Sequence, residues 1–444
     1  MALSAAIIWE VRPANGTANA GGGFKAGASG TDRSQQNAVF TAFTDLVLAT
    51  TTTLTSAANP FGATDVGNVL CITGGTGFTV GLYEIVSVSV VTATVDRVAG
   101  TGGSTGGTGN LGGARSGFSV GTTTLQASLV AGQKVYVKNE AWNEAVSLTI
   151  AGTATNPITI EGYNASRGDL DFVPSQWANR PVNDRASAAG DAFDFASGAN
   201  NYVVKYLVAK SAGAIGFDNP GDALFIGCRA TANGTNGFST GVLGVACEAD
   251  LNGGAGISSG SADHRALGFY LHNNTGRGAQ TTTSGGLFYS FSVFEANASD
   301  GIEVAGSGAL TALNCICDGN TGAASDGVSI VNIRILLNNC IFSNNGQYGV
   351  NASTSGAASW ANYNNYFGNA TAARNNFPTG PNDQAVDPGF VDRANGNFAI
   401  GTALKALGYP GIFPAGLSTG YLDIGAVQRQ EPAGGGGLAR IIGG

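Results

Sequence analysis

The sequence predicts an all-β protein, in which a right-handed parallel β-helix (a solenoid) is joined to a small N-terminal β module and an extended C-terminal arm. Three observations predict this fold class. The 444 residues include 70 glycines, 11% charged residues and 43% hydrophobic residues, which is the composition of a folded, turn-rich chain. Short runs alternate apolar and polar residues with the period of a β-strand. Finally, one motif recurs with a period in the low twenties, which is typical of solenoids.

Residues 1–125 are expected to form a β-rich attachment module that ends in a glycine-rich linker. The runs Asn68–Gly75, Leu82–Val91 and Thr92–Gly100 are rich in β-branched residues and predict a small antiparallel sheet. The low-complexity run Gly100–Gly113 has glycine spacings similar to those of phosphate-binding loops, but no Gly-Lys-Ser/Thr follows it. We therefore predict that this run is a flexible linker.

Residues 126–370 carry the repeat of the predicted β-helix. Its first register position is occupied, at intervals of 19, 22, 23, 23 and 25 residues, by Cys228, Cys247, Phe269, Ser292, Cys315 and Cys340. The residue two positions later is always apolar, and the residue five positions later is always asparagine: Asn233, Asn252, Asn274, Asn297, Asn320 and Asn345. Nine positions later a glycine follows in five copies, and the sixth copy reaches its glycine after a three-residue insertion: Gly237, Gly256, Gly278, Gly301, Gly349 and Gly327.

These positions define structural ladders through roughly ten stacked coils, a rod of about 50 Å at the usual strand spacing. The first and third positions are predicted to point inward, so the four register cysteines are interpreted as buried, reduced thiols. Stacked asparagines are expected to hydrogen-bond from coil to coil, and the glycine is expected to supply a corner with positive φ. Residues 371–430 are expected to close the β-helix, and residues 431–444 to form the glycine-rich arm.

Charge and residue usage argue against several classes of function. A net charge of −8 and a pI of about 4.8 argue against direct binding to nucleic acid. The chain has two histidines, His264 and His272, which argues against a histidine-built metal site, and no metal or cofactor is expected. The N-terminal apolar run has no basic residues before it, and no later run is long enough to span a bilayer. We therefore expect folding in the cytoplasm and no membrane association.

Two parts of the sequence resemble a known group of proteins. Gly132–Asp169 is similar to the first coils of right-handed parallel β-helix proteins of the pectate-lyase-like type, and Val386–Tyr409 with Leu422–Gln428 is similar to the closing segment of bacterial and phage β-helix proteins. In this segment Thr402–Gly408 replaces the Ser-Pro-Ala-Ile-Asp-like turn that such proteins usually have. The N-terminal module resembles modules of phage structural proteins. The resemblance implies the fold for about residues 125–428 and side-by-side homotrimers, but leaves the function open among lyases, hydrolases, adhesins and viral spikes.

Three residues after each register position lies a stripe that is predicted to face outward: Thr231, Asp250, His272, Glu295, Asp318 and Ser343. Glu295 and Asp318 occupy adjacent coils, about 5 Å apart by strand spacing, which is near the carboxylate separation of retaining glycosidases. Asp250, His272, Glu295 and Asp318 are therefore the candidate catalytic residues. The alternative, which the sequence favours, is a solvated ladder without catalysis. Few aromatic residues that could bind a sugar ring lie nearby: Tyr270, Phe288 and Tyr289.

The leading hypothesis is a structural protein of a phage virion, namely a capsid cement or decoration protein displayed as a β-helical knob or spike, without enzymatic activity. Two alternatives remain: a phage tailspike depolymerase that binds and cleaves host surface polysaccharide, and a bacterial β-helix adhesin. The arm residues Leu438, Ile441 and Ile442 are expected to dock on a neighbouring protein. The expected partners are further copies in a homotrimer, the major capsid protein or tail components, and a host glycan. The expected location is the virion, assembled in the host cytoplasm.

Overall fold

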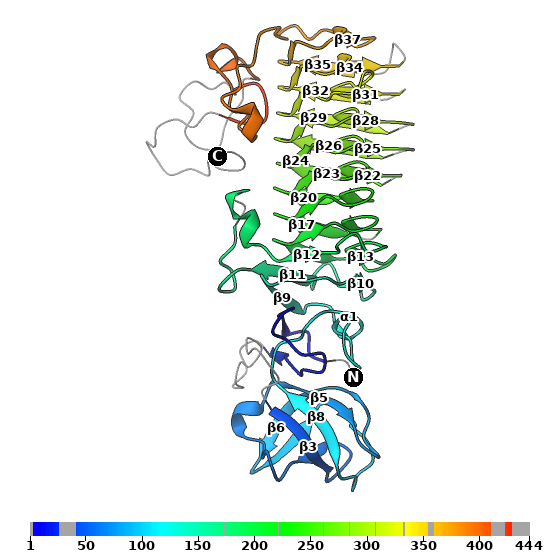
Figure 1. The fold of residues 1–444 in the computed structure, drawn as a ribbon, viewed down its shortest axis with the longest axis vertical. Coiled ribbons are helices and arrows are strands. Elements are labelled where there is room, and N and C mark those ends of the chain that lie inside the picture. Colours follow the sequence, from blue (N-terminus) through cyan, green and yellow to red (C-terminus); the bar gives the residue numbers. More distant parts are fainter. Residues whose placement is uncertain are drawn as a thin grey trace. The chain divides into compact units, whose positions relative to one another are not determined.

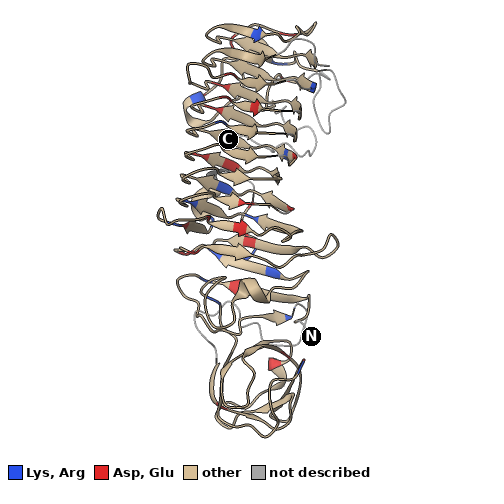
Figure 2. Ribbon diagram, turned by 90° about the vertical axis from the view of Figure 1, so that its right-hand side faces the viewer, with Lys and Arg blue, Asp and Glu red and all other residues tan. Residues whose placement is uncertain are grey.

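The computed structural model describes residues 3–25, 41–171, 174–220, 222–260, 262–283, 285–306, 308–331, 334–353, 359–409 and 422–428. The chain divides into two compact units, each described by itself below. Unit 1 comprises Met1–Asp171, Ala178–Arg185 and Phe193–Leu207, and unit 2 comprises Phe172–Trp177, Ala186–Ala192 and Val208–Gly444. Strands dominate both units (Figure 1), with acidic and basic residues interspersed along them (Figure 2). The predicted arm residues Leu438, Ile441 and Ile442 lie outside the described residues.

Unit 1 contains a closed antiparallel barrel in the order β3-β4-β7-β6-β5-β8. Its strands are β3 Thr41–Leu48, β4 Thr53–Thr55, β5 Val69–Gly74, β6 Gly81–Ser89, β7 Thr92–Val95 and β8 Gly107–Leu111, with a 3-10 turn η1 at Ala63–Asp65. Side chains such as Phe43, Leu70 and Ile85 fill the interior. The strands thus close into a barrel, which the alternating pattern alone did not distinguish from a small open sheet.

The prediction of a flexible glycine-rich linker at Gly100–Gly113 is wrong, because its second half is barrel strand β8, which pairs with β3 and β5. The glycines allow neighbouring groups to approach the strand closely. A Cβ on Gly109 would lie 2.7 Å from the carbonyl oxygen of Cys71, and one on Gly107 would lie 2.5 Å from the ring of Phe78. Glycine is therefore required by packing here, and does not indicate flexibility.

The rest of unit 1 forms the first parallel coils. Its elements are β1 Ile7–Val11, β2 Phe24–Lys25, α1 Leu125–Ser128, β9 Lys134–Lys138, β10 Val146–Leu148, β11 Ile158–Tyr163, β12 Val182–Asp184, β13 Phe193–Phe195 and β14 Tyr202–Lys205. Strand β1 pairs in parallel with β9, and its buried Trp9 donates a 2.9 Å hydrogen bond to Gln133. The composition of the N-terminal segment indicated a loop, but Ile7–Val11 forms a strand of a parallel sheet.

Unit 2 is a parallel β-helix, as predicted, in which each coil contributes one strand to each of three sheets (Figure 1). Sheet A consists of β17 Ala223–Ile226, β20 Leu243–Val245, β23 His264–Leu267, β26 Gly286–Ser290, β29 Ala309–Leu313, β32 Arg334–Asn338 and β35 Ser359–Asn362. Sheet B consists of β15 Val208–Lys210, β18 Arg229–Thr231, β21 Glu248–Asp250, β24 Tyr270–His272, β27 Val293–Glu295, β30 Ile316–Asp318, β33 Ile341–Ser343 and β36 Asn365–Phe367. Sheet C consists of β16 Phe217–Asp218, β19 Phe238–Ser239, β22 Ile257–Ser259, β25 Ala279–Thr281, β28 Ile302–Val304, β31 Val328–Ile330, β34 Tyr348–Ala352 and β37 Ala372–Asn375. Three short 3-10 turns, η2 Pro174–Asn179, η3 Arg393–Asn395 and η4 Thr402–Leu404, lie outside the sheets. No helix in the described part of the chain is both long and apolar enough to cross a membrane.

The predicted register is confirmed strand by strand. The four register cysteines are buried and form no disulfide. The apolar residues two positions later, from Ala230 to Phe342, are buried as well. In the asparagine ladder the amide nitrogen of each side chain donates to the side-chain oxygen of the next coil, over 2.9 Å between Asn233 and Asn252 and 2.8 Å between Asn320 and Asn345. The same amide also reaches a backbone carbonyl, as from Asn252 to Ala230. These buried amides are therefore satisfied, which makes the ladder stabilising.

The expected role of the ladder glycines is wrong, because their φ angles are not positive. The left-handed corner lies four positions after the register position and is occupied by Ala232, Leu251, Asn273, Ala296, Gly319 and Asn344. The glycines serve close packing instead. A Cβ on Gly278 would lie 2.6 Å from the carbonyl oxygen of Gly301 and 3.0 Å from the side-chain nitrogen of Asn297. Glycine at this position therefore leaves room for the asparagine ladder.

The segment after the last coil packs on the outer face of sheet B. Phe398, Ile400, Leu404, Ile424 and Ala426 form one buried cluster with three strand residues of that face: Val293, Ile316 and Ile341. This contact continues through a hydrogen bond of 2.7 Å from the side-chain nitrogen of Asn339 to the backbone oxygen of Asp423. Among the described residues, the C-terminal segment therefore covers the apolar part of the outer face of sheet B.

The buried register predicts how the thiols react. All six cysteines are buried, so a thiol reagent should modify none of them in the native protein and all of them after denaturation. Mass spectrometry after treatment with a maleimide under both conditions measures this difference. Rapid modification of Cys228 or Cys340 in the native protein would contradict the inward register.

Candidate active site

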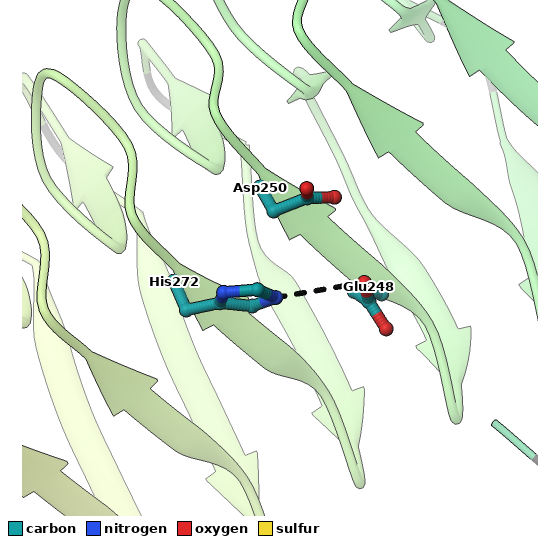
Figure 3. Close-up of side chains that lie close together, drawn as sticks. All are labelled: Glu248, Asp250 and His272. Carbon is teal, nitrogen blue, oxygen red and sulfur yellow. Dashed lines mark ion pairs between the residues drawn. The ribbon is translucent and has the colours of Figure 1, made fainter. Parts of the chain in front are cut away.

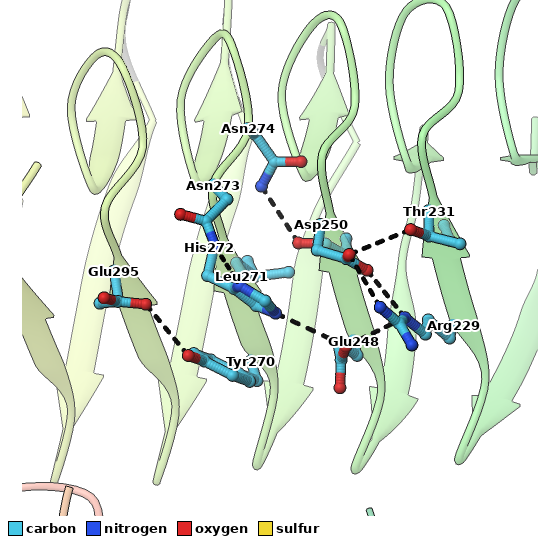
Figure 4. Close-up of polar contacts among 12 residues, drawn as sticks. Arg229, Thr231, Glu248, Asp250, Tyr270, Leu271, His272, Asn273, Asn274 and Glu295 are labelled. Atoms are coloured by element: carbon cyan, nitrogen blue, oxygen red, sulfur yellow. Dashed lines mark hydrogen bonds and ion pairs between the residues drawn. The ribbon is translucent and has the colours of Figure 1, made fainter. Parts of the chain in front are cut away.

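The outer face of sheet B carries two columns of side chains, because the middle residue of each three-residue strand points into the core. The first column is Arg229, Glu248, Tyr270, Val293, Ile316 and Ile341, and the second is Thr231, Asp250, His272, Glu295, Asp318 and Ser343. The C-terminal segment covers the apolar end of the first column. The polar end, from β18 to β27, forms the candidate site (Figure 4).

At one end of the site one guanidinium group pairs with two carboxylates. Arg229 donates two hydrogen bonds of 2.8 Å to Asp250 and lies 3.0 Å from Glu248. Thr231 donates a further hydrogen bond of 3.0 Å to Asp250. This two-point pairing makes Asp250, which is almost completely buried, a firmly held anion.

His272 is oriented on three sides. Its Nε2 lies 3.5 Å from Glu248, and its Nδ1 lies 2.8 Å from the side-chain nitrogen of Asn273. The donor and acceptor roles in this contact depend on the tautomer of the ring; with the amide nitrogen of Asn273 as donor, Nδ1 accepts and the neutral imidazole carries its proton on Nε2. The ring also stacks on Tyr270, with 3.8 Å between ring centroids and 17° between planes. The stacking on Tyr270 and the contact with Asn273 therefore hold the imidazole in place, as acid–base catalysis requires.

Glu295 lies one strand from His272 and is half-buried. Burial raises the pKa of its carboxyl group, and the negative charge of Asp318 adds to this effect. The hydroxyl of Tyr270, which donates a 3.0 Å hydrogen bond to Glu295, works in the opposite direction, as do His272 and Arg393. The net result is a carboxyl group that retains its proton to higher pH than an exposed glutamate.

The prediction of a solvated ladder is wrong at Asp250 and at Asp318. Asp318 lies next to Glu295, as expected, but it is completely buried. It accepts hydrogen bonds of 2.6 Å from Ser343 and 3.0 Å from Asn344, and it pairs at 2.6 Å with Arg393 of the C-terminal segment. Because these contacts occupy both of its oxygens, Asp318 anchors the C-terminal segment and cannot reach a substrate.

Aromatic rings contact the site at both ends. The guanidinium of Arg229 lies 5.8 Å from the ring centroid of Trp177, and Tyr270 meets Phe398 edge to face at 6.1 Å. The sequence pattern did not single out Trp177, Arg393 or Phe398, since they belong to segments without a repeat. Of the aromatic candidates, Tyr270 lies in the site, whereas Phe288 is exposed on sheet A and Tyr289 is buried in the core. Glu248 was also missed, although the same repeat places it one strand from Arg229.

Three residues of the site offer donor atoms of the kind that bind metal ions. Glu248, Asp250 and His272 each offer one ligand atom, and these three atoms lie within 4.8 Å of one another (Figure 3). However, Arg229 already pairs with both carboxylates and supplies the positive charge that a cation would bring. These residues therefore fit a metal poorly while Arg229 is in place. The other histidine, His264, is buried in sheet A, where burial lowers its pKa to about 4.

Comparison with known proteins adds no family assignment. No protein-family model matches the sequence, and no curated protein matches it. Similar solved structures include the A-module of the mannuronan C-5 epimerase AlgE6 from Azotobacter vinelandii, with 18% identity, a TM-score of 0.32, and coverage of 58% of this chain and 78% of the other. Pectate lyase Pel9A has 13% identity and a TM-score of 0.39, with coverage of 71% and 93%. The tailspike protein gp49 from Pseudomonas phage LKA1 has 13% identity and a TM-score of 0.17, with coverage of 79% and 64%. At these values the likenesses assign no activity to this chain.

Proposed function

We propose that this protein is a polysaccharide depolymerase that hydrolyses a glycan bound across the polar part of the outer face of sheet B. The observation that carries this proposal is the pair of acid–base groups on adjacent strands: His272, held in place by Asn273 and Tyr270, and Glu295, whose pKa is raised by burial. Two titratable groups in different environments are the usual basis of an acid and base assignment.

In the proposed reaction Glu295 donates its proton to the leaving glycosidic oxygen. The attacking water displaces the amide of Asn273 from Nδ1 of His272, and this nitrogen accepts the proton of the water. The products are two shorter chains, and one molecule of water has been added across the bond. Tyr270 is a positioning residue, because its ring stacks on His272 and its hydroxyl group bonds to Glu295. The partly exposed Arg229 can donate hydrogen bonds to sugar hydroxyl groups at the edge of the site, and Asp250 holds its guanidinium in position.

The proposal replaces the hypothesis of a capsid decoration protein without enzymatic activity, for which no feature of the described residues provides support. The partly exposed ring of Trp177 beside Arg229 supports a glycan as ligand, since aromatic faces pack against sugar rings. We propose that this depolymerase is a phage tailspike, which was one of the two alternatives from the sequence. Attachment to a virion through unit 1, and assembly with tail components, are parts of this proposal that need their own test.

Incubation with a panel of bacterial surface polysaccharides tests the proposal. The wild-type protein is expected to release reducing ends from at least one polysaccharide, and His272→Ala is expected to lower that rate about 10²-fold, because the water loses its base. Ultraviolet absorbance of the products distinguishes hydrolysis from elimination, which leaves an unsaturated sugar. A panel that includes the polysaccharides of the natural host and shows no release by the wild type would contradict the function.

A further inference from the structure

The catalytic pair of the proposed reaction lies directly beside the C-terminal segment. In the second column of sheet B, Glu295 is followed by Asp318, whose Oδ2 lies 2.6 Å from Nε of Arg393. In the first column, Tyr270 meets Phe398 edge to face at 6.1 Å, and the three apolar residues that follow Tyr270 are buried under the C-terminal segment. The C-terminal segment therefore covers both columns beyond β27.

The part of this segment that borders the site, residues 393–398, is called the wall below. It approaches the catalytic pair closely at Gly396, which follows η3 and has a φ of 75°. A Cβ on Gly396 would lie 3.3 Å from the hydroxyl oxygen of Tyr270, and this hydroxyl group donates the hydrogen bond to Glu295. Glycine thus permits both the left-handed turn and the close approach of the wall to Tyr270.

The segment that carries the wall is fixed to three consecutive coils. At β36 the side chain of Asn365 donates a 2.9 Å hydrogen bond to the backbone oxygen of Val386 and accepts one of 3.1 Å from its backbone nitrogen. Before β33 the side-chain nitrogen of Asn339 donates a 2.7 Å hydrogen bond to the backbone oxygen of Asp423. The ion pair of Arg393 is the third attachment, at β30. These contacts, together with the buried apolar cluster, make the wall a fixed border of the site.

We propose that the wall restricts this protein to the ends of glycan chains, so that it releases short fragments from one end and does not cleave within a chain. This inference rests on the proposed function, because it concerns the glycan that Glu295 and His272 cleave. On the side of the wall, Arg393 pairs with Asp318 only one strand spacing, about 4.8 Å, from Glu295. One sugar unit of a glycan has about this length, so one or two sugars fit between the cleaved bond and the wall.

The rest of the glycan lies on the other side of the catalytic pair. From Glu295 to Arg229 the site spans three strand spacings, about 14 Å, which is enough for several sugars. Arg229 and the ring of Trp177 beside it are the proposed binding groups at this end. The long part of the chain is therefore held by these groups, and its terminal sugars meet the wall.

Size-exclusion chromatography and mass spectrometry of early products test the inference, with a polysaccharide that the wild-type protein cleaves. We expect fragments of one or two sugars from the first time point, while the remaining polymer keeps most of its length. A ladder of long fragments with a rapid fall in the mean mass of the polymer would overturn the inference and leave the proposed hydrolysis in place. No release from any polysaccharide of the panel would contradict the proposed function, and the inference with it.

A double variant, Arg393→Ala with Phe398→Ala, removes the two side chains that hold the wall against sheet B. We expect it to release long fragments early, so that the mean mass of the polymer falls severalfold faster for each reducing end released. Val391→Asp is the matched control, because Val391 is 66% exposed on the same segment and lies outside the buried cluster, and it should keep the short products. Circular dichroism shows whether the double variant is folded, and the product sizes of the wild type decide the inference if it is not. A folded double variant that still releases only short fragments would overturn the role of the wall.

Discussion

Replacing Glu295 by glutamine is expected to lower the rate of polysaccharide cleavage about 10³-fold. The amide keeps the shape of the side chain and can still accept the hydrogen bond from Tyr270, but it has no proton of suitable acidity to give to the leaving oxygen. Initial rates of reducing-end release at saturating polysaccharide measure the effect. Because binding groups such as Arg229 and Trp177 are unchanged, the loss should fall on kcat and not on KM.

Glu303→Gln is the matched control for this experiment. Glu303 is also a glutamate on an outer strand position, paired with Arg277, but it belongs to sheet C and is remote from the site. Its substitution should leave the cleavage rate within about twofold of the wild type. An equal loss in both variants would indicate damage to the fold, and an unchanged rate in Glu295→Gln would remove Glu295 from the mechanism.

The raised pKa of Glu295 also gives the sign of two pH effects. Cleavage needs the protonated form, so the rate should fall as the pH rises through the raised pKa. Stability changes in the same direction, because a carboxyl group with a higher pKa in the folded state binds its proton more tightly there. Its contribution to the free energy of unfolding is full below the pKa of Glu295 in the unfolded chain, and it is lost as the pH rises through the pKa of Glu295 in the folded protein. Glu295→Gln stays neutral and should therefore melt no earlier than the wild type above that range.

The second large effect is expected for Phe294→Asp, which should destabilise unit 2 by more than about 4 kcal/mol and prevent its folding at ordinary temperatures. Phe294 is completely buried in the inward column between Leu271 and Cys317, and its ring meets Tyr289 edge to face at 5.0 Å. A carboxylate at this position would have no partner for its charge. Neighbouring coils could not relax around it, because their strands are hydrogen-bonded on both sides.

Phe294→Leu is the appropriate comparison, since it keeps an apolar side chain and leaves a small cavity. We expect it to cost about 1–2 kcal/mol and to preserve the parallel strands. Circular dichroism during urea unfolding of both variants measures the difference. A folded, cooperatively melting Phe294→Asp protein would show that the inward column is assigned incorrectly.

The coil of this protein was predictable because its environment repeats. Asn274 and Asn297 occupy the same place in successive coils, form the same hydrogen bonds and therefore recur in the sequence with the period of the fold. Glycine was predicted at the correct positions but for the wrong reason, since a sequence pattern does not distinguish positive φ from close packing. At Gly278 the neighbouring carbonyl decides the matter.

The repeat in the sequence was enough to predict the β-helix, its register, its buried thiols and the adjacency of His272, Glu295 and Asp318, because stacking imposes one environment on each copy of a repeat. Which of these residues form the candidate site depends on contacts of the folded unit. Asp318 is buried by Arg393, and the C-terminal segment, which has no period, selects the part of sheet B that it covers. Contacts of this kind join residues far apart in the chain through irregular segments, whose course depends on the packing of the whole unit and leaves no repeating signal.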